Sequence, residues 1–344
     1  MKKAELYTKR AVGIVVFVLI FVVLFLHADR LLARKSVDGW WNTTAKIDGF
    51  YNSPENAYDV MFFGSSHAYA SFNPLVLWEQ TGVKSYVFAT QQQPVWATYH
   101  YMVDAISRQD LDLAVVDVLM LSKTEEYYDD GVNYTFCDNM PLSRNKLELV
   151  AASAPKGERF NLACRFMKYH SRWNELSKAD FDYRKSKMED YSKGYCVLTE
   201  AISDAIAPDV ENISEKSEIT EKNLLYLNKI IDLCEEQGVE LMLVKTPSNA
   251  TKEEKMYYNA VEAIAKEHDL DFVDYNLVYD EIGLDLKQDF YDKSHLNVRG
   301  AEKFTKYFSE STKYFEGKTR NDDDWMRELA EYETNKKAID ENSD

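Results

Sequence analysis

The sequence has few cysteines and no excess of basic residues, and each shortage argues against a class of site. Its four cysteines do not form the C-x-x-C pairs that are typical of zinc ligands, so the sequence predicts no metal site. Its 41 basic residues are outnumbered by 58 acidic ones, and the formal net charge is −17. Because a phosphate backbone attracts positive charge, no nucleic-acid partner is expected.

The cysteines are expected to be free or to form one disulfide. Cys234 lies in an apolar helical pattern, where a buried free thiol is the ordinary explanation. If the middle of the chain lies outside the cell, one pair among Cys137, Cys164 and Cys196 could be a disulfide. Three cysteines leave the pairing undetermined.

An apolar run near the N-terminus predicts a membrane anchor. Residues 11–28 follow a basic start, and His27 is their only clearly polar residue. At about 1.5 Å per residue, this run approaches the roughly 30 Å hydrocarbon core of a bilayer. A cleavable signal peptide has the same charged start and apolar centre. We favour an uncleaved anchor because the run is long and Leu26-His-Ala28 is a poor small-x-small cleavage site.

The rest of the composition predicts one folded domain attached to this anchor. With 45% hydrophobic and 13% aromatic residues, the chain has enough apolar material for a core after the anchor is excluded. Arg30, Arg34 and Lys35 nearly balance the positive charges before the anchor, so charge alone leaves its orientation open. The expected parts are an N-terminal segment, the anchor, a juxtamembrane linker, an α/β domain and a charged tail, at residues 1–10, 11–28, 29–57, 58–316 and 317–344.

A serine follows the first predicted strand. Val60 to Phe63 form a continuous apolar run, as expected for a strand buried on both faces of a parallel sheet. Gly64 then permits a sharp turn. Ser66 would thus sit at the carboxyl end of the strand, where open α/β sheets place their ligands and chemistry. The alternative is a polar turn in which Ser65 or Ser66 caps the next segment.

The far end of the chain contains residues that would activate such a serine. An Asp292-x-x-His295 pair lies just ahead of a helical pattern at residues 301–315. An aspartate that accepts a hydrogen bond from one imidazole nitrogen leaves the other nitrogen to take a proton from a serine hydroxyl. Ser66, His295 and Asp292 are therefore predicted to be the catalytic nucleophile, base and orienting carboxylate.

These two motifs resemble those of the SGNH/GDSL hydrolase superfamily, in which G-x-S follows the first strand and Asp-x-x-His closes the domain. Here they read Gly64-Ser-Ser-His67 and Asp292-Lys-Ser-His-Leu296, and they look most like the membrane-anchored branch with DltD-like and AlgJ-like proteins. The resemblance spans roughly residues 58–315. The superfamily's Gly and Gly-x-Asn motifs, which supply oxyanion donors, are not recognisable, and Asp117-Val-Leu-Met120 stands where Gly-x-Asn-Asp is expected.

The resemblance implies a fold and an activity. The fold is a three-layer SGNH-like, or flavodoxin-like, α/β domain. The activity is that of a serine acyltransferase or esterase, without a cofactor, on ester-linked acyl groups of extracytoplasmic glycans or glycopolymers, as in O-acetylation or D-alanylation. The N-terminus would be cytoplasmic and the domain outside the cell membrane, with a membrane-bound O-acyltransferase as a possible partner. The contrasting class is a non-catalytic glycan-binding or scaffold partner of such an acyltransferase. The missing oxyanion motifs favour that class, and the complete Ser, His and Asp set disfavours it.

Periodicity also predicts an α/β architecture. Strands that alternate with amphipathic helices indicate a mainly parallel sheet covered on both faces. The alternation lapses in an insertion at about 122–218, and the tail is expected to be solvated unless its apolar residues dock. The predicted strands are 60–63, 85–89, 111–121, 239–244 and 272–274, the helices are 95–107, 221–237, 252–267 and 301–315, and the apolar tail residues are Trp325, Leu329 and Tyr332.

The insertion contains candidate acceptor-binding residues. It is rich in tyrosine and charge, and the segment around His170 and Arg172 combines polar and aromatic groups suited to a sugar or polyol. Segments inserted at strand ends are where an α/β enzyme acquires specificity. A structural lid with satisfied polar contacts is the alternative.

The remaining candidates lie beside the predicted nucleophile. The amides of Gln91, Gln92 and Gln93, in the loop after the second strand, could donate hydrogen bonds to an oxyanion, or the loop could be a plain polar connection. Gly64 lies in the same motif as the serine. His67 is expected either to orient substrate or to pack into its own loop.

Overall fold

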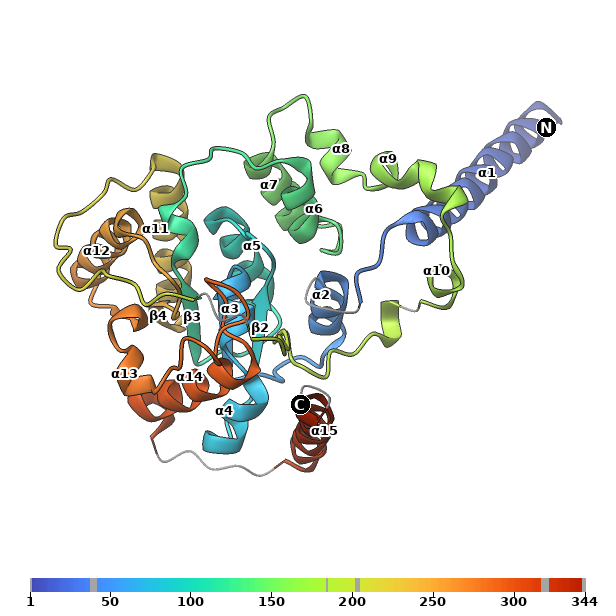
Figure 1. The fold of residues 1–344 in the computed structure, drawn as a ribbon. Helices are drawn as coiled ribbons and strands as arrows, with labels where there is room; N and C mark the ends of the chain where they lie inside the picture. Colours follow the sequence, from blue (N-terminus) through green and yellow to red (C-terminus); the bar gives the residue numbers. More distant parts are fainter. Residues whose placement is uncertain (1, 38–41, 184, 202–204, 317–321, 342–344) are drawn as a thin grey trace.

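A five-stranded parallel sheet organises the chain (Figure 1). The computed structural model describes residues 2–37, 42–183, 185–201, 205–316 and 322–341. The strands are β1 (Val60–Gly64), β2 (Ser85–Ala89), β3 (Leu113–Asp117), β4 (Glu240–Lys245) and β5 (Asp271–Asp274). Their order in the sheet, β2-β1-β3-β4-β5, is that of flavodoxin-like folds. The predicted α/β architecture with a parallel sheet is confirmed.

The strands form where apolar runs can be buried on both faces. Every residue of β1, β2 and β3 is buried, as a sheet between two helical layers requires. The third strand is shorter than the predicted 111–121. It ends at Asp117 because the Asp117 carboxylate accepts a hydrogen bond from the Leu119 N–H (3.1 Å), and the chain turns into the 3-10 helix η1 (Leu119–Ser122).

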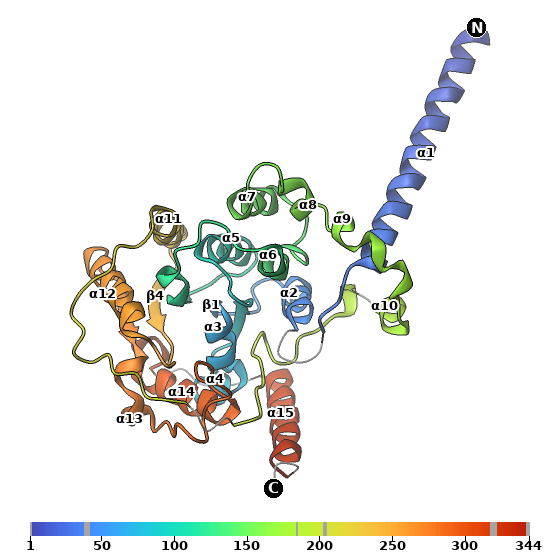
Figure 2. The ribbon, with the colours of Figure 1, turned by 45° about the horizontal axis from the view of Figure 1, so that its top comes forward.

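Helices cover both faces of the sheet (Figure 2). They are α3 (Ser66–Ser71), α4 (Pro74–Thr81), α5 (Val95–Ile106), α11 (Glu221–Gln237), α12 (Lys252–Glu267), α13 (Tyr279–Ile282) and α14 (Val298–Ser311), with 3-10 turns η4 (Tyr275–Leu277) and η5 (Lys313–Phe315). On one face α5 packs against α11, and on the other α14 packs against α3 and α4. The predicted bounds of α11 and α12 are confirmed.

Aromatic side chains fix α14 against β1. The ring of Phe72 lies 4.1 Å from that of Phe62, and 5.2 Å from those of Phe304 and Phe308, measured between centroids. All four side chains are fully buried. Because burial of one such side chain contributes about 1.5–3 kcal/mol, this cluster holds α14 firmly against the sheet. It thereby positions the loop at residues 289–297, which precedes the helix.

Part of the predicted juxtamembrane linker, 29–57, is instead a buried helix of the domain. α2 (Thr43–Asn52) buries Ile47 and Phe50 completely. The ring of Phe50 stacks on that of Phe88 in β2, with 4.1 Å between centroids. A helix this short gives a weak periodic signal, and its burial depends on a strand that lies far from it in the sequence. The α/β domain therefore begins at α2.

The charged tail docks on the domain. α15 (Asp323–Glu341) buries Trp325 and Tyr332. The Trp325 ring lies 6.1 Å from that of Trp78 in α4, and the Tyr332 hydroxyl donates a hydrogen bond to the Glu302 carboxylate (2.8 Å). The structure thus has the docked arrangement rather than a solvated helix.

The N-terminal helix projects away from the domain (Figure 2). α1 (Lys2–Leu32) contains a segment, Leu6–Leu32, that is long and apolar enough to cross a membrane. Its side chains from residue 6 to residue 24 are exposed. A bilayer would surround such side chains with hydrocarbon, so the helix is consistent with membrane association.

Short helices build the predicted insertion. They are α6 (Asp130–Cys137), α7 (Arg144–Ser153), α8 (Arg159–Ala163), α9 (Phe166–Tyr169), η2 (His170–Asn174), α10 (Lys178–Asp182) and η3 (Lys185–Lys187). Those from α9 to α10 pack against α1. All four cysteines are free, so the disulfide that the sequence left open is not formed; Cys137, Cys196 and Cys234 are buried and Cys164 is half-buried.

Candidate active site

The first part of the site is the turn after β1. Gly64 has a φ of +142°, a conformation that L side chains rarely adopt. A Cβ atom at this position would lie 2.9 Å from the Cβ of Asp117 and 3.2 Å from that of Ala68. Ser65 follows as the N-cap of α3, and Ser66 is the first residue of that helix. Only glycine allows this turn, which brings Ser66 to the carboxyl edge of the sheet.

The second part is a tight loop before α14. The Asp292 carboxylate accepts hydrogen bonds from the backbone N–H groups of Ser294 and His295, both at 2.8 Å. The Tyr291 N–H donates to the His295 carbonyl (2.9 Å) and closes the loop. The side chain of Asn297 then caps α14. These local bonds hold the Asp292 and His295 side chains in a defined orientation.

The fold brings three predicted residues into one hydrogen-bonded chain. Ser66 Oγ lies 2.8 Å from His295 Nε2. On the other side of the ring, His295 Nδ1 lies 2.9 Å and 3.0 Å from the two carboxylate oxygens of Asp292. These distances are normal for hydrogen bonds. The arrangement can hold a neutral imidazole with its proton on Nδ1, ready to accept the Ser66 proton on Nε2.

The Asp292 carboxylate is negative at physiological pH. Burial opposes its ionisation, but the hydrogen bond and charge of His295, together with the backbone N–H groups of Ser294 and His295, lower the pKa of Asp292 to about 2. A carboxylate in this state can fix the imidazole tautomer and stabilise an imidazolium ion.

A buried lysine contacts the histidine beside Ser66. Lys245 ends β4, and its Nζ lies 3.2 Å from His67 Nδ1 and 3.7 Å from a carboxylate oxygen of Asp117. The same oxygen accepts hydrogen bonds from the N–H and hydroxyl of Thr246, at 3.0 Å and 2.8 Å. The rings of His67 and His295 meet edge to face, with 4.9 Å between centroids. A second polar chain therefore runs from the sheet edge to the His295 ring.

Burial and charge set the protonation of His67. Burial, and then the positive charge of Lys245, lower the pKa of His67 well below its usual range, so the imidazole is neutral at pH 7. Burial also lowers the pKa of Lys245, and the Asp117 carboxylate opposes that effect. Because an ammonium group can only donate, a Lys245 bond to Nδ1 requires the His67 proton on Nε2. No residue in the described part of the chain forms a hydrogen bond with Nε2.

The loop predicted to supply oxyanion donors lies after β2, and the side chain of one of its glutamines forms hydrogen bonds within the loop. Gln93 is buried, and its side-chain oxygen accepts hydrogen bonds from the N–H and hydroxyl of Thr90, both at 3.0 Å. The Gln91 carbonyl accepts from the Thr135 hydroxyl in the insertion (3.3 Å). Gln92 is exposed. The Gln93 side chain is therefore already engaged in shaping this loop.

His170 and Arg172 lie beside the C-terminal end of α1, not beside Ser66. Arg172 donates a hydrogen bond to the Leu32 carbonyl (2.7 Å) and forms an ion pair with Asp180 (3.3 Å). His170 is exposed, and its Nδ1 lies 2.8 Å from the Met167 carbonyl. In both views α9 and α10, which flank these residues, lie with α1 and apart from α3 (Figures 1 and 2). Arg172 thus connects the insertion to α1, His170 bonds within the insertion, and the predicted acceptor-binding role of both residues stays a prediction.

The contact of Lys245 with His67, and the pairing of Lys245 with Asp117, were not predicted from the sequence. Both residues directly follow apolar strand patterns, at 239–244 and within 111–121. A charge that ends a central strand is buried and needs a partner, because an unpaired buried charge is strongly unfavourable. That pattern was available in the sequence, whereas the pairing of these residues depends on the adjacency of β3 and β4.

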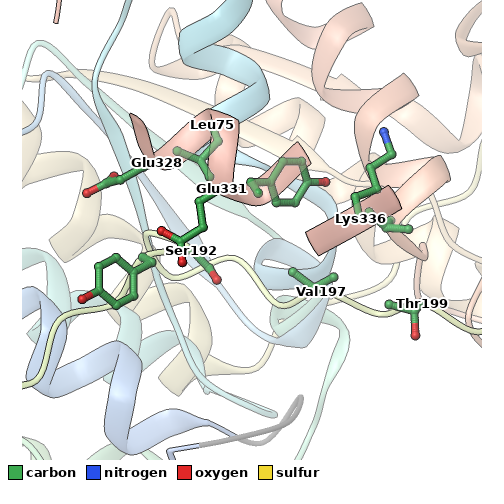
Figure 3. A pocket seen from close by; sticks show the side chains of 10 residues that line it. Leu75, Ser192, Val197, Thr199, Glu328, Glu331 and Lys336 are labelled. Carbon is green, nitrogen blue, oxygen red and sulfur yellow. The ribbon is translucent and has the colours of Figure 1, made fainter. Parts of the chain in front are cut away.

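A cavity of about 270 Å³ lies beside α15 (Figure 3). Ser66, Asp292 and His295 do not line it, so it is separate from the hydrogen-bonded chain. Its walls combine apolar side chains with charged side chains of α15, and they include Leu75, Val197, Val298, Glu328, Glu331 and Lys336.

Comparison with known proteins gives no activity for this site. A profile of a protein family of unknown function matches residues 170–315. This match covers less than half of the chain and includes Asp292 and His295 but not Ser66. No curated protein matches the chain.

Replacement of Gly64 is expected to destabilise the fold. Gly64→Ala would place a Cβ against Asp117 in a backbone conformation that alanine avoids, so we expect a loss of about 1–3 kcal/mol in the free energy of unfolding. Gly157→Ala is the matched control, because no atom lies within 4 Å of its added Cβ. Unfolding of both variants in detergent checks the prediction. Equal stability of the two variants would contradict it.

Proposed function

We propose that the chain is a membrane-anchored serine acyltransferase or esterase that acts on ester-linked acyl groups of extracytoplasmic glycans or glycopolymers. The observation that carries the proposal is the hydrogen-bonded chain from Ser66 through His295 to Asp292. The resemblance of the two motifs to the membrane-anchored SGNH branch supports the substrate class, as an analogy.

Both half-reactions follow from the position of His295 between Ser66 and Asp292. Ser66 Oγ attacks the acyl carbonyl carbon, and its proton passes to His295 Nε2. His295 then returns that proton to the departing alcohol oxygen, which leaves the acyl group on Ser66. In the second half, His295 removes a proton from water or a sugar hydroxyl, whose oxygen attacks the acyl-serine carbonyl. The proton returns to Ser66 Oγ as the acyl bond breaks.

His67 is proposed as a donor to the oxyanion that forms in each half-reaction. The Gly-x-Asn motif that supplies a donor in the SGNH superfamily is missing here. His67 directly follows the nucleophile, is neutral and has its proton assigned to Nε2, while Lys245 occupies Nδ1. A neutral, fixed N–H donor stabilises developing negative charge without giving up its proton.

The ends of α1 support an uncleaved anchor. α1 continues as a helix through Ala28, the end of the poor cleavage site, to Leu32. Beyond the apolar run, Asp29 forms an ion pair with Arg165 (2.8 Å), and the Leu32 carbonyl accepts a hydrogen bond from Arg172. The helix is thus unbroken across Leu26-His-Ala28, which supports an uncleaved anchor. The outward position of the domain rests on the resemblance to the membrane-anchored branch.

Anchoring favours transfer over general hydrolysis. A tethered site meets any acyl donor delivered through a membrane partner at a raised effective concentration. Hydrolysis of freely diffusing esters gains little from such a tether. An acceptor hydroxyl can compete with water when it is held in the correct orientation. A membrane-bound O-acyltransferase is the proposed supplier of the acyl group.

A fluorophosphonate probe is expected to label Ser66. Labelling should be lost in Ser66→Ala and should slow by about 10²- to 10⁴-fold in His295→Ala, because positioned general-base catalysis contributes that much. Mass spectrometry of the full chain in detergent locates and times the modification.

Ser65→Ala is the matched control for this experiment. Ser65 is the adjacent hydroxyl, and it is buried with no hydrogen-bond partner for its Oγ in the described structure, so its removal should leave labelling unchanged. Undiminished labelling of Ser66→Ala would refute the nucleophile assignment. Folded wild-type protein that resists the probe would favour the non-catalytic partner instead.

Removal of the His67 N–H is expected to slow acylation of Ser66. His67→Phe keeps a ring beside His295 but has no donor, and loss of one oxyanion donor typically lowers the rate about 10²- to 10³-fold. His67→Gln places an amide N–H near the original Nε2 and should recover part of the rate. Stopped-flow acylation by an activated ester measures both variants. Wild-type rates in folded His67→Phe would exclude the donor role.

Replacement of Ser66 in the cell is expected to remove acyl esters from a surface polymer. We would introduce Ser66→Ala at the native locus, with Ser65→Ala as the control, and measure alkali-labile acyl groups on cell-surface polymers. Loss of ester in Ser66→Ala alone supports transfer. A gain would show a deacylase, and unchanged ester would argue against both activities.

A further inference from the structure

The C-terminal end of α1 is held by the insertion. The ring of Phe25 lies 5.0 Å from that of Phe166 in α9. One helical turn later, Asp29 pairs with Arg165 (2.8 Å), and Arg30 donates to the Tyr183 carbonyl (2.9 Å). Further contacts join Arg172 to the Leu32 carbonyl and Lys35 to Asp180. These bonds fix the height of the insertion along the axis of α1.

If α1 crosses a bilayer, the part of the insertion that contacts α1 lies at the surface of that bilayer. Leu26 is the last residue of the continuous apolar run, and Phe25 beside it touches the insertion. A helix rises about 1.5 Å per residue, so the segment from Phe25 to Leu32 spans roughly 10 Å. The headgroup zone on one side of a bilayer has a comparable depth, of about 5–8 Å. The part of the insertion that touches this segment therefore lies at headgroup level.

The insertion exposes large apolar side chains there. Met167 lies in α9 and Trp173 in η2, and both elements pack against α1. Leu142 lines a groove together with Phe25 and Leu26 of the anchor. Phe160 lies in α8, next to α9 (Figure 2). These four side chains are between 44% and 77% exposed. Tryptophan is enriched where a protein crosses the boundary between hydrocarbon and water, and phenylalanine and leucine line the buried face of helices that lie at this boundary.

Positive charge accompanies these apolar groups, although the whole chain is strongly acidic. Arg34 and Lys168 are exposed beside the same segment. Lys168 also lies over the Tyr134 ring, with its Nζ 3.1 Å from the ring centroid. Cations at headgroup level are attracted by lipid phosphates. The apolar and basic surface continues directly from the end of a membrane-spanning helix. This position favours lipid over a soluble protein as its binding partner.

We propose that Leu142, Phe160, Met167 and Trp173 form a membrane-docking surface that enters the headgroup zone of the bilayer crossed by α1. The occupant of this surface is the lipid bilayer. A single spanning helix can tilt in the bilayer, and the domain bonded to the end of α1 would tilt with it. A second contact through the insertion fixes the orientation of Ser66 relative to the membrane. The proposal rests on the membrane anchoring proposed above.

Photo-crosslinking in liposomes tests this surface. A diazirine amino acid would replace Trp173 or Met167, one at a time, in the full chain reconstituted in phosphatidylglycerol and phosphatidylcholine vesicles. Phe17, in the exposed apolar part of α1, is the positive control. Leu225 is the negative control, because it is similarly exposed on α11, which lies far from α1 in both views. We expect phospholipid adducts at 173, 167 and 17, and only background at 225.

The controls separate the possible failures. Background adducts at 173 and 167, with strong adducts at 17, would overturn the docking surface and leave the anchor intact. Adducts at 225 as strong as those at 173 would also overturn it. Crosslinks from position 173 to a second copy of the chain would show that this surface binds protein rather than lipid, and would overturn the proposal. Background at 17 would refute the anchor itself. Fluorophosphonate labelling of Ser66 in the same vesicles reports the proposed chemistry separately.

Discussion

The hydrogen bond between Ser66 Oγ and His295 Nε2 is the contact on which the rest of the site depends, because it joins residues 229 positions apart in the sequence. Neither residue has a special property alone. A serine at a helix start and a histidine in a loop form a hydrogen bond only because the fold brings the ends of β1 and α14 together. The aromatic cluster around Phe72 supplies that constraint, since it packs α14 against the sheet and so positions the His295 loop that precedes this helix.

The buried polar groups at the sheet edge form a second layer of support. Asp117 accepts hydrogen bonds from Thr246 and faces Lys245, and Lys245 in turn contacts His67. Such buried charges persist only when their partners are well placed, because desolvation of an ion is strongly unfavourable. The same Asp117 side chain leaves no space for a Cβ at Gly64. The Asp117 side chain thus couples the backbone conformation at Gly64, the pairing of the Lys245 charge and the position of Ser66.

The C-terminal end of α1 and part of the insertion hold each other in place. The part of the insertion from α9 to α10 buries few of its residues, and it gains a fixed position by packing against the end of α1. Arg172 illustrates the point, because a side chain that suits a sugar ligand in the sequence bonds to the last helical carbonyl of α1 in the structure. In our proposals, the insertion therefore orients the domain relative to the membrane. Residues around Ser66 would recognise the acceptor.

Local patterns in the sequence were sufficient to predict several features of the structure. The bounds of α11 and α12 follow from long amphipathic periodicity, and the residues Ser66, Asp292 and His295 follow from two short motifs. Such signals are local, because helix periodicity and a hydrogen bond three residues away depend on neighbours in the chain. Shorter or context-dependent elements were missed: α2 carries too few residues for a clear period and becomes a helix of the domain by packing on β2.

Only the tertiary structure decided which polar groups meet. It placed Lys245 against His67, engaged the Gln93 side chain within its own loop, and moved His170 and Arg172 to the end of α1. It also docked Trp325 and Tyr332, whose apolar character the sequence shows but whose partners it does not. The physical reason is the same in each case. A side chain's hydrogen-bond partner is set by which strands and helices become neighbours, and that choice depends on the packing of the whole core rather than on any one segment.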